Sequence, residues 1–194
     1  MEEDINPKLA IMHRFYYIIA VCFLVNLISG CTHNQPSSQI SSDNGNAVIV
    51  ENVPFVKQKD KFCGPASMAS VLQFYGEVID QGEIAEVIYI PQLNGALISD
   101  MENYARNNGY NVESTNGSIE ILKDNLKKKT PVILLVDKGK WKVSLPHYYV
   151  AYGYNDEKKT IILHTGDKED QEISYDKLVE EWSRMNNLML VVTP

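Results

Sequence analysis

The stretch of sequence that decides the fold is QKDKFCGPASMASVLQFYG, residues 58–76. Its apolar residues from Met68 onward recur at the spacing of one face of an α-helix. Pro65 is suited to a first helical turn, and Gly76 is a typical residue just past a helix end. We therefore expect a helix that begins at Cys63, whose thiol would stand where unpaired amides and the helix dipole favour the thiolate.

Helical patterns continue through the first half of the chain. Ser99 followed by Glu102 has the spacing of a capping box, and Gly109 would end that helix. The helices expected after the first one cover residues 81–89, 99–109 and 118–128.

The second half of the chain has the composition of strands. Short apolar runs rich in Val, Ile, Leu and Tyr are separated by polar connections such as residues 155–159. Strands are expected at 131–136, 147–154, 160–164 and 188–192, with a short helix at 174–184. Helices followed by antiparallel strands predict an α+β fold, in which an N-terminal helical half packs on a C-terminal antiparallel sheet.

Three residues have the chemistry of a thiol hydrolase site. Such a site needs a thiolate, a base beside it, and donors for the oxyanion that forms when a carbonyl is attacked. Cys63 is the candidate nucleophile, and His147, at the start of a strand, is the candidate base. The side-chain amide of Gln58 is a candidate oxyanion donor, beside the Cys63 amide.

Three motifs carry a resemblance to a known family: Val53-Pro54-Phe55-Val56-Lys57-Gln58, Cys63-Gly64-Pro65-Ala66-Ser67, and the run from Pro146 to Tyr154. Together they resemble the double-glycine, bacteriocin-processing branch of the papain-like cysteine peptidases, over nearly all of the chain after Val50. The resemblance implies a papain-like fold and a peptide or protein substrate, and it implies no cofactor.

Carried over residue by residue, the resemblance makes Cys63 the nucleophile, His147 the general base and Gln58 the oxyanion-hole side chain. The best-known family members cut leader peptides after a Gly-Gly pair and are fused to an export transporter. This sequence contains no transporter, so it is more similar to a stand-alone lipoprotein variant of the family.

The chain departs from the family where an Asp usually orients the catalytic His. It has His164-Thr165-Gly166-Asp167 at that place. Either His164 or Asp167 could orient His147, or the enzyme could work with the Cys-His pair alone. The tyrosines of the strand expected at 147–154 are expected to pack in the sheet, with Tyr152 or Tyr154 as possible neighbours of the substrate groove.

The N-terminal segment predicts export and lipidation. Arg14 precedes an apolar run at 15–28, and Leu27-Ile28-Ser29-Gly30-Cys31 resembles a bacterial lipobox. We expect a signal peptide at 1–30, lipid on Cys31, a polar tether at 31–49 and the peptidase domain at 50–194. Because acidic residues open the chain, translation could start at Met12 instead of Met1.

This layout predicts a membrane-anchored bacterial lipoprotein outside the cytoplasm. Cys22 would leave with the signal peptide and Cys31 would carry lipid, so Cys63 would be the one remaining thiol. Thr32 stands where an Asp would resemble an inner-membrane retention signal. In a cell with two membranes, we therefore expect the outer membrane, facing the periplasm.

Composition and spacing argue against other classes of function. The formal charge is −7 and the basic residues form no stripe, so nucleic acid is not an expected partner. The histidines His33, His147 and His164 have neither a Cys pair nor a closely spaced His pair, so no metal site is expected.

Three hypotheses for the function follow. The first is an exported, lipid-anchored cysteine peptidase that forms an acyl-enzyme on Cys63, with Gly-Gly as a possible cleavage site. The second is a Cys-His-His hydrolase of cell-wall peptides, in which His164 takes part. The third is a lipoprotein of the same fold that binds a peptide without cleaving it, which an unreactive Cys63 would favour.

Overall fold

The computed structural model describes residues 46–194. The predicted signal peptide, the Cys31 predicted to carry lipid and most of the predicted tether lie outside these residues. Within residues 46–194, no helix is both long enough and apolar enough to cross a membrane.

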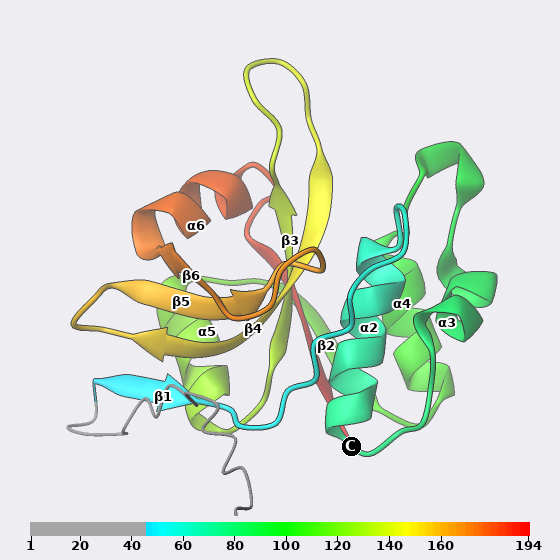
Figure 1. Ribbon diagram of the computed structural model, residues 1–194, viewed down its shortest axis with the longest axis horizontal. Helices are drawn as coiled ribbons and strands as arrows, with labels where there is room; N and C mark the ends of the chain where they lie inside the picture. Colours follow the sequence, from blue (N-terminus) through cyan, green and yellow to red (C-terminus); the bar gives the residue numbers. More distant parts are fainter. Residues whose placement is uncertain (1–45) are drawn as a thin grey trace, which may run out of the picture. The chain divides into compact units, whose positions relative to one another are not determined.

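The first layer of the fold is a group of helices. It contains α2 (Cys63–Phe74), α3 (Gln81–Ile88) and α4 (Ile98–Asn107), with a short 3-10 turn, η2 (Pro91–Leu93), before α4. In Figure 1 these helices lie together on one side of the sheet. The predicted helices at 63–76, 81–89 and 99–109 thus correspond to α2, α3 and α4.

The helix ends have identifiable chemical causes. Gly76 follows α2 with a φ of 97°, a conformation that favours glycine, and the Glu77 amide bonds back to the Leu72 carbonyl. The capping box predicted at Ser99 is wrong, because α4 begins at Ile98 and no side chain caps it. A capping box is instead present at Asp80, whose side chain accepts from the Gly82 amide at 2.6 Å.

The second layer is an antiparallel sheet of seven strands within the described residues. Its strands follow the order β2-β7-β3-β4-β5-β6, and β1 pairs with β4 beside this path. The strands are β1 (Ala47–Ile49), β2 (Asn111–Asn116), β3 (Val132–Asp137), β4 (Pro146–Asn155), β5 (Thr160–His164), β6 (Gln171–Ser174) and β7 (Leu188–Thr193).

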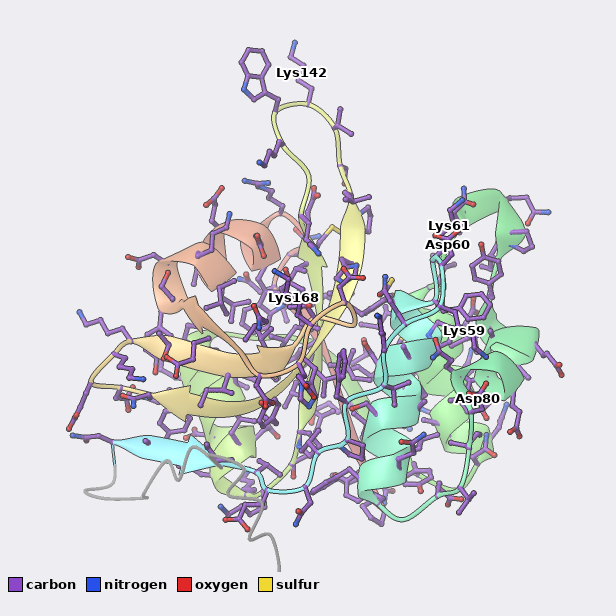
Figure 2. All side chains as sticks on the ribbon, viewed as in Figure 1. Lys59, Asp60, Lys61, Asp80, Lys142 and Lys168 are labelled. Atoms are coloured by element: carbon purple, nitrogen blue, oxygen red, sulfur yellow. The ribbon has the colours of Figure 1, made fainter. Side chains whose placement is uncertain are left out.

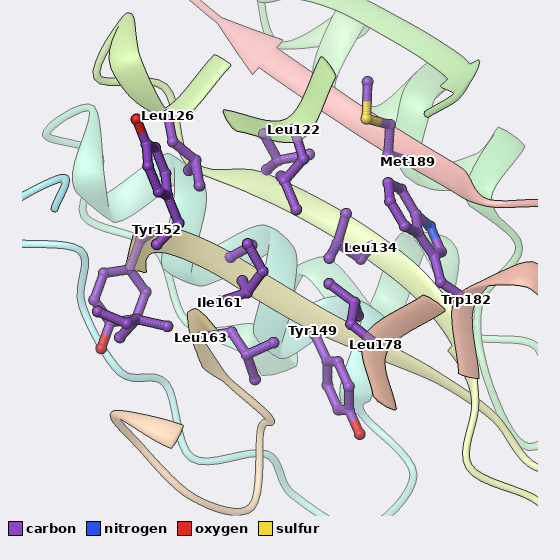
Figure 3. Close-up of a cluster of buried hydrophobic side chains, with 14 of the residues drawn as sticks. Leu122, Leu126, Leu134, Tyr149, Tyr152, Ile161, Leu163, Leu178, Trp182 and Met189 are labelled. Atoms are coloured by element: carbon purple, nitrogen blue, oxygen red, sulfur yellow. The ribbon is translucent and has the colours of Figure 1, made fainter. Parts of the chain in front are cut away.

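Both faces of the sheet are covered. All six residues of β3 are buried, which is typical of a central strand between two layers. Ile133 and Leu135 contact the core shared with α2, α3 and α4, whereas Leu134 contacts the opposite core. That opposite core lies under α5 (Ile119–Lys127) and α6 (Tyr175–Ser183), and Figure 3 shows Trp182 and Leu122 within it.

The predicted fold class is confirmed: N-terminal helices pack on a C-terminal antiparallel sheet. Three strands were not predicted. β2 is polar and mostly exposed and forms by pairing with β7, and β6 has the same half-exposed character. β1 pairs with β4 through residues 47–49, so the sheet includes three residues that precede the predicted domain start at Val50.

Candidate active site

The candidate nucleophile, Cys63, is the first residue of α2. Its sulfur lies against the start of β4, where the backbone amide of Tyr148 points at it. The amides of Gly64 and of Cys63 itself point at the sulfur as well. Three backbone donors therefore surround the position at which negative charge would develop.

The thiol does not have the lowered pKa that its place at a helix N-terminus predicted. Burial raises the pKa of Cys63 above its ordinary value, and the three backbone amides offset only part of this effect. Burial disfavours the charged form of any acid, since the thiolate loses its water. The isolated site therefore holds a neutral thiol at neutral pH.

The candidate base, His147, is the second residue of β4 and directly precedes Tyr148. Its side chain is buried, with 8% exposed. The Nε2 atom lies 2.6 Å from the carbonyl oxygen of Thr165, in the connection between β5 and β6. Because a carbonyl can only accept, Nε2 must carry the proton, and Nδ1 keeps the free lone pair of a base.

The pKa of His147 is lowered, mainly by burial, although the hydrogen bond to Thr165 favours the charged form. Lys138 also lowers the pKa of His147 by charge repulsion, whereas Asp167 raises it. His147 is thus neutral at neutral pH. No hydrogen bond joins Cys63 Sγ to His147 in the part of the chain that the structure describes, and catalytic hydrogen bonds are often unformed in unliganded sites. The link between the two residues is through Tyr148, which follows His147 and whose amide points at the sulfur.

Gln58 is held by the same β5–β6 connection that holds His147. Its backbone amide donates to the Gly166 carbonyl at 2.9 Å. Its side-chain Oε1 is buried with no hydrogen-bond partner among residues 46–194, against Gly166. The other end of the amide, Nε2, carries the donors that an oxyanion would need.

Gly166 leaves room for this arrangement. Its φ is 80°, and a β-carbon at this position would lie 2.6 Å from Gln58 Oε1. The Thr165 carbonyl accepts from the imidazole of His147, and the next carbonyl, of Gly166, accepts from the backbone amide of Gln58. One short turn fixes both residues.

The two residues predicted as possible orienting groups are placed elsewhere. The ring of His164 is buried, with Nε2 3.1 Å from the Val53 carbonyl and Nδ1 accepting from the Asp170 amide at 3.3 Å. Asp167 forms an ion pair with Lys138 at 3.7 Å. Neither side chain forms a hydrogen bond with His147 in the described structure, and the group that does is the Thr165 carbonyl.

A groove opens directly beside Cys63. Its volume is about 620 Å³, and its lining is largely apolar. One wall is the segment from Leu93 to Ser99, which leads into the first turn of α4. The other is formed by residues 144–146 with Leu135 and Tyr148. Such a groove can hold an extended peptide with apolar side chains next to the thiol.

The groove walls were not predicted from the sequence. Tyr152 and Tyr154 lie in the core on the other face of the sheet, and Tyr148 borders the groove instead. The hydroxyl of Tyr148 donates to the Ala96 carbonyl at 3.0 Å and so joins the two walls. A strict period of two along β4 would place Tyr148, Tyr152 and Tyr154 on one face. The irregularity between Ala151 and Gly153 shifts this alternation, so Tyr152 and Tyr154 face the opposite core.

Metal-binding side chains do not gather at this site. Across residues 46–194, His, Cys, Asp and Glu side chains nowhere come together in a group of three or more. The chemistry that the described side chains can support is therefore that of a thiol, an imidazole and amide donors.

Comparison with known proteins agrees with this geometry. Residues 50–189 match the Peptidase_C39 like family. The peptidase domain of Streptococcus ComA, a bi-functional ABC transporter involved in a quorum-sensing pathway, is 27% identical. The match covers 73% of this chain and 98% of that domain, with a TM-score of 0.63.

Two more distant structures share the fold. A C39-like peptidase from Bacillus anthracis is 20% identical over 76% of this chain and 98% of its own, with a TM-score of 0.62. A double-glycine-motif protease from an AMS/PCAT transporter, solved with its leader peptide, is 20% identical. That match covers 73% of this chain and 91% of the other, with a TM-score of 0.58.

No curated protein sequence matches the chain. The family match nevertheless covers the helices of the described residues, the strands from β2 to the start of β7, and each of Gln58, Cys63 and His147. A match of this extent establishes membership, and the chain belongs to the Peptidase_C39 like family.

Proposed function

We propose that this chain is an exported, lipid-anchored cysteine peptidase that hydrolyses a peptide bond through an acyl-enzyme on Cys63. The observation that carries the proposal is the hydrogen bond from His147 Nε2 to the Thr165 carbonyl. It fixes the tautomer in which Nδ1 is the base. The next residue, Tyr148, points its backbone amide at the Cys63 sulfur.

In the first step, His147 Nδ1 takes the thiol proton as Sγ attacks the carbonyl carbon of the substrate. The carbonyl π electrons move to oxygen, and the oxyanion accepts hydrogen bonds from the Cys63 amide and Gln58 Nε2. The intermediate collapses, the C–N bond breaks, and His147 gives its proton to the leaving amine. A thioester on Cys63 remains.

In the second step, His147 deprotonates a water molecule, which attacks the thioester carbonyl. The second oxyanion uses the same donors, and its collapse expels the Cys63 sulfur. The sulfur regains its proton from His147. The net reaction is hydrolysis of one peptide bond.

Family membership and the groove beside Cys63 support a peptide substrate, and the leader peptide held by one relative makes a Gly-Gly site the first to test. The test is hydrolysis of a fluorogenic peptide panel with Gly-Gly and Ala-Ala before the scissile bond. We expect turnover that Cys63→Ala abolishes and His147→Ala strongly lowers. Turnover that survives Cys63→Ala would refute the mechanism.

A non-catalytic peptide-binding lipoprotein is the second candidate function, and the raised thiol pKa favours it. The peptide panel separates the two functions, since a binding protein would bind peptide without turnover in wild type and Cys63→Ala alike. No observation favours the Cys-His-His alternative, because both ring nitrogens of His164 bind backbone atoms.

The lipid anchor and export are supported by the sequence alone: Arg14, the apolar run at 15–28 and the lipobox-like residues 27–31. The test is metabolic labelling with palmitate, in which wild type should be labelled and Cys31→Ala should not. An unlabelled wild type, or label that persists in Cys31→Ala, would contradict the anchor while leaving the peptidase mechanism untouched.

A further inference from the structure

The connection between β3 and β4, residues 138–145, forms a hairpin loop that projects beyond the sheet (Figure 1). The base of this hairpin loop is firmly held. Asp137, which is buried, accepts hydrogen bonds from the Gly139 amide at 2.8 Å and the Leu145 amide at 2.7 Å. Arg184 donates to the Gly139 carbonyl at 2.7 Å. The tip is therefore presented on a fixed support.

The hairpin loop exposes apolar side chains that would ordinarily be covered. Trp141 is fully exposed, Val143 is 71% exposed and Leu145 is 57% exposed. On the facing wall of the groove, Leu93 and Leu97 are exposed as well. An exposed patch of this kind on a soluble domain marks an interaction surface.

The charge of the hairpin loop is opposite to that of the chain. It carries Lys138, Lys140 and Lys142 and no acidic residue, whereas the whole chain has a formal charge of −7. Lys138 pairs with Asp167, but Lys140 and Lys142 form no ion pair within the described residues. Figure 2 shows Lys142 at the far end of the loop. An anionic surface would therefore attract this loop and repel most of the domain.

We propose that the hairpin loop docks on an anionic lipid bilayer, with Trp141 at headgroup level and Lys140 and Lys142 against lipid phosphates. Tryptophan prefers this interface, because its ring is apolar and its N–H remains hydrated. Lysine stems can lie along the apolar boundary while the ammonium groups contact phosphate. An anionic bilayer surface therefore matches a projecting loop tip that is both basic and aromatic.

Docking would orient the active site. Residues 144–146 are part of the hairpin region and also line the groove beside Cys63. With the hairpin on the bilayer, the groove mouth faces lipid, and Leu93 and Leu97 complete an apolar rim around it. Peptides that lie on the membrane or emerge from it would then reach the Cys63 thiol more readily than peptides free in solution.

The two tryptophans of the chain make a direct test possible, since Trp141 is fully exposed and Trp182 is fully buried. The full chain is reconstituted into phosphatidylcholine vesicles, with or without phosphatidylglycerol, that contain lipids brominated near the headgroup. We expect quenched tryptophan emission in the anionic vesicles, and little quenching in Trp141→Phe, where only Trp182 emits.

Charge variants identify the source of the attraction. Lys140→Gln/Lys142→Gln should lower the ratio of docked to undocked loop by about fivefold per lysine. The matched control is Lys127→Gln/Lys128→Gln at the end of α5, which removes the same charge and should change nothing. Raising the salt to 1 M, where the Debye length falls to about 3 Å, should weaken quenching in wild type.

Equal quenching in wild type and Trp141→Phe, or in neutral and anionic vesicles, would overturn the proposal. An acidic peptide is the competing occupant. If quenching is absent and Lys140→Gln/Lys142→Gln instead raises KM for acidic peptides in lipid-free solution, the proposal is overturned and the loop belongs to substrate binding.

Discussion

Replacing Gly166 by Ala tests whether the β5–β6 turn positions the oxyanion donor. The new β-carbon would lie 2.6 Å from Gln58 Oε1 and 3.3 Å from its Cδ, so the Gln58 side chain must move. Loss of one oxyanion donor lowers kcat by about 10²–10³-fold. The φ of 80° adds a backbone strain of about 1–2 kcal/mol for any residue with a β-carbon.

Gly109→Ala is the matched control. Gly109 has a φ of 89°, and a β-carbon there would meet nothing within 4 Å. The backbone strain is then similar while the active site is untouched. For a domain of this size, 1 kcal/mol lowers Tm by about 2–4 °C, so both variants should melt about 2–8 °C lower.

The assay is kcat on the best peptide of the panel, with Tm measured by scanning calorimetry on the same samples. We expect similar Tm losses in the two variants and a large kcat loss in Gly166→Ala alone. If Gly166→Ala keeps the kcat of Gly109→Ala, Gln58 does not act from the position that the turn gives it, and the oxyanion role of its side chain is refuted.

Three further predictions concern protonation and packing. Burial raises the pKa of Cys63, so the rate of its alkylation by iodoacetamide should rise only above about pH 8.5, and fast alkylation at pH 7 would contradict this. Burial lowers the pKa of His147, so the loss of kcat/KM on the acid side of the pH profile should lie below about pH 6.5. His164→Gln should cost about 1–3 kcal/mol in urea unfolding, because His164 bonds two backbone groups, while the pH profile of kcat/KM stays unchanged; a shifted profile would restore His164 as the orienting residue. In Gly64→Ala the new β-carbon would lie 3.0 Å from that of Ala96, which lines the groove. The substitution should destabilise the folded domain by about 1–3 kcal/mol in urea unfolding and raise KM, because it displaces the groove wall. An unchanged KM would show that this wall does not contact substrate.

Local sequence patterns were sufficient to predict the fold class. Helical periodicity after Cys63 predicted α2, and the run at 131–136 predicted the buried β3, because each element is decided by its own apolar residues. β2 could not be predicted in this way. Its polar residues form a strand only because β7 offers a paired edge, which is a tertiary effect.

The groups of the candidate site likewise include some that the sequence could identify and some that it could not. Side chains with their own chemistry, such as Cys63 and His147, could be selected from the sequence. In the structure the Cys63 sulfur meets the backbone amide of Tyr148, the residue after His147. The Thr165 carbonyl could not be selected, because every residue has a carbonyl and only the folded turn shows where it points. The sign of the thiol pKa shift also depended on burial, which a helix start alone does not reveal.

A carbonyl in place of a carboxylate changes the electrostatics of the site more than its geometry. Both groups hold Nε2–H and leave Nδ1 as the base, but only a carboxylate carries the negative charge that stabilises imidazolium. Thr165 supplies the orientation without that charge, and Asp167, the nearest acid in the turn, is paired with Lys138. Burial then keeps both the Cys63 thiol and the His147 imidazole neutral. In our mechanism the proton therefore moves from the thiol to His147 Nδ1 during attack on the substrate, when the oxyanion donors, including the Gln58 amide beside Gly166, begin to stabilise the charge that develops.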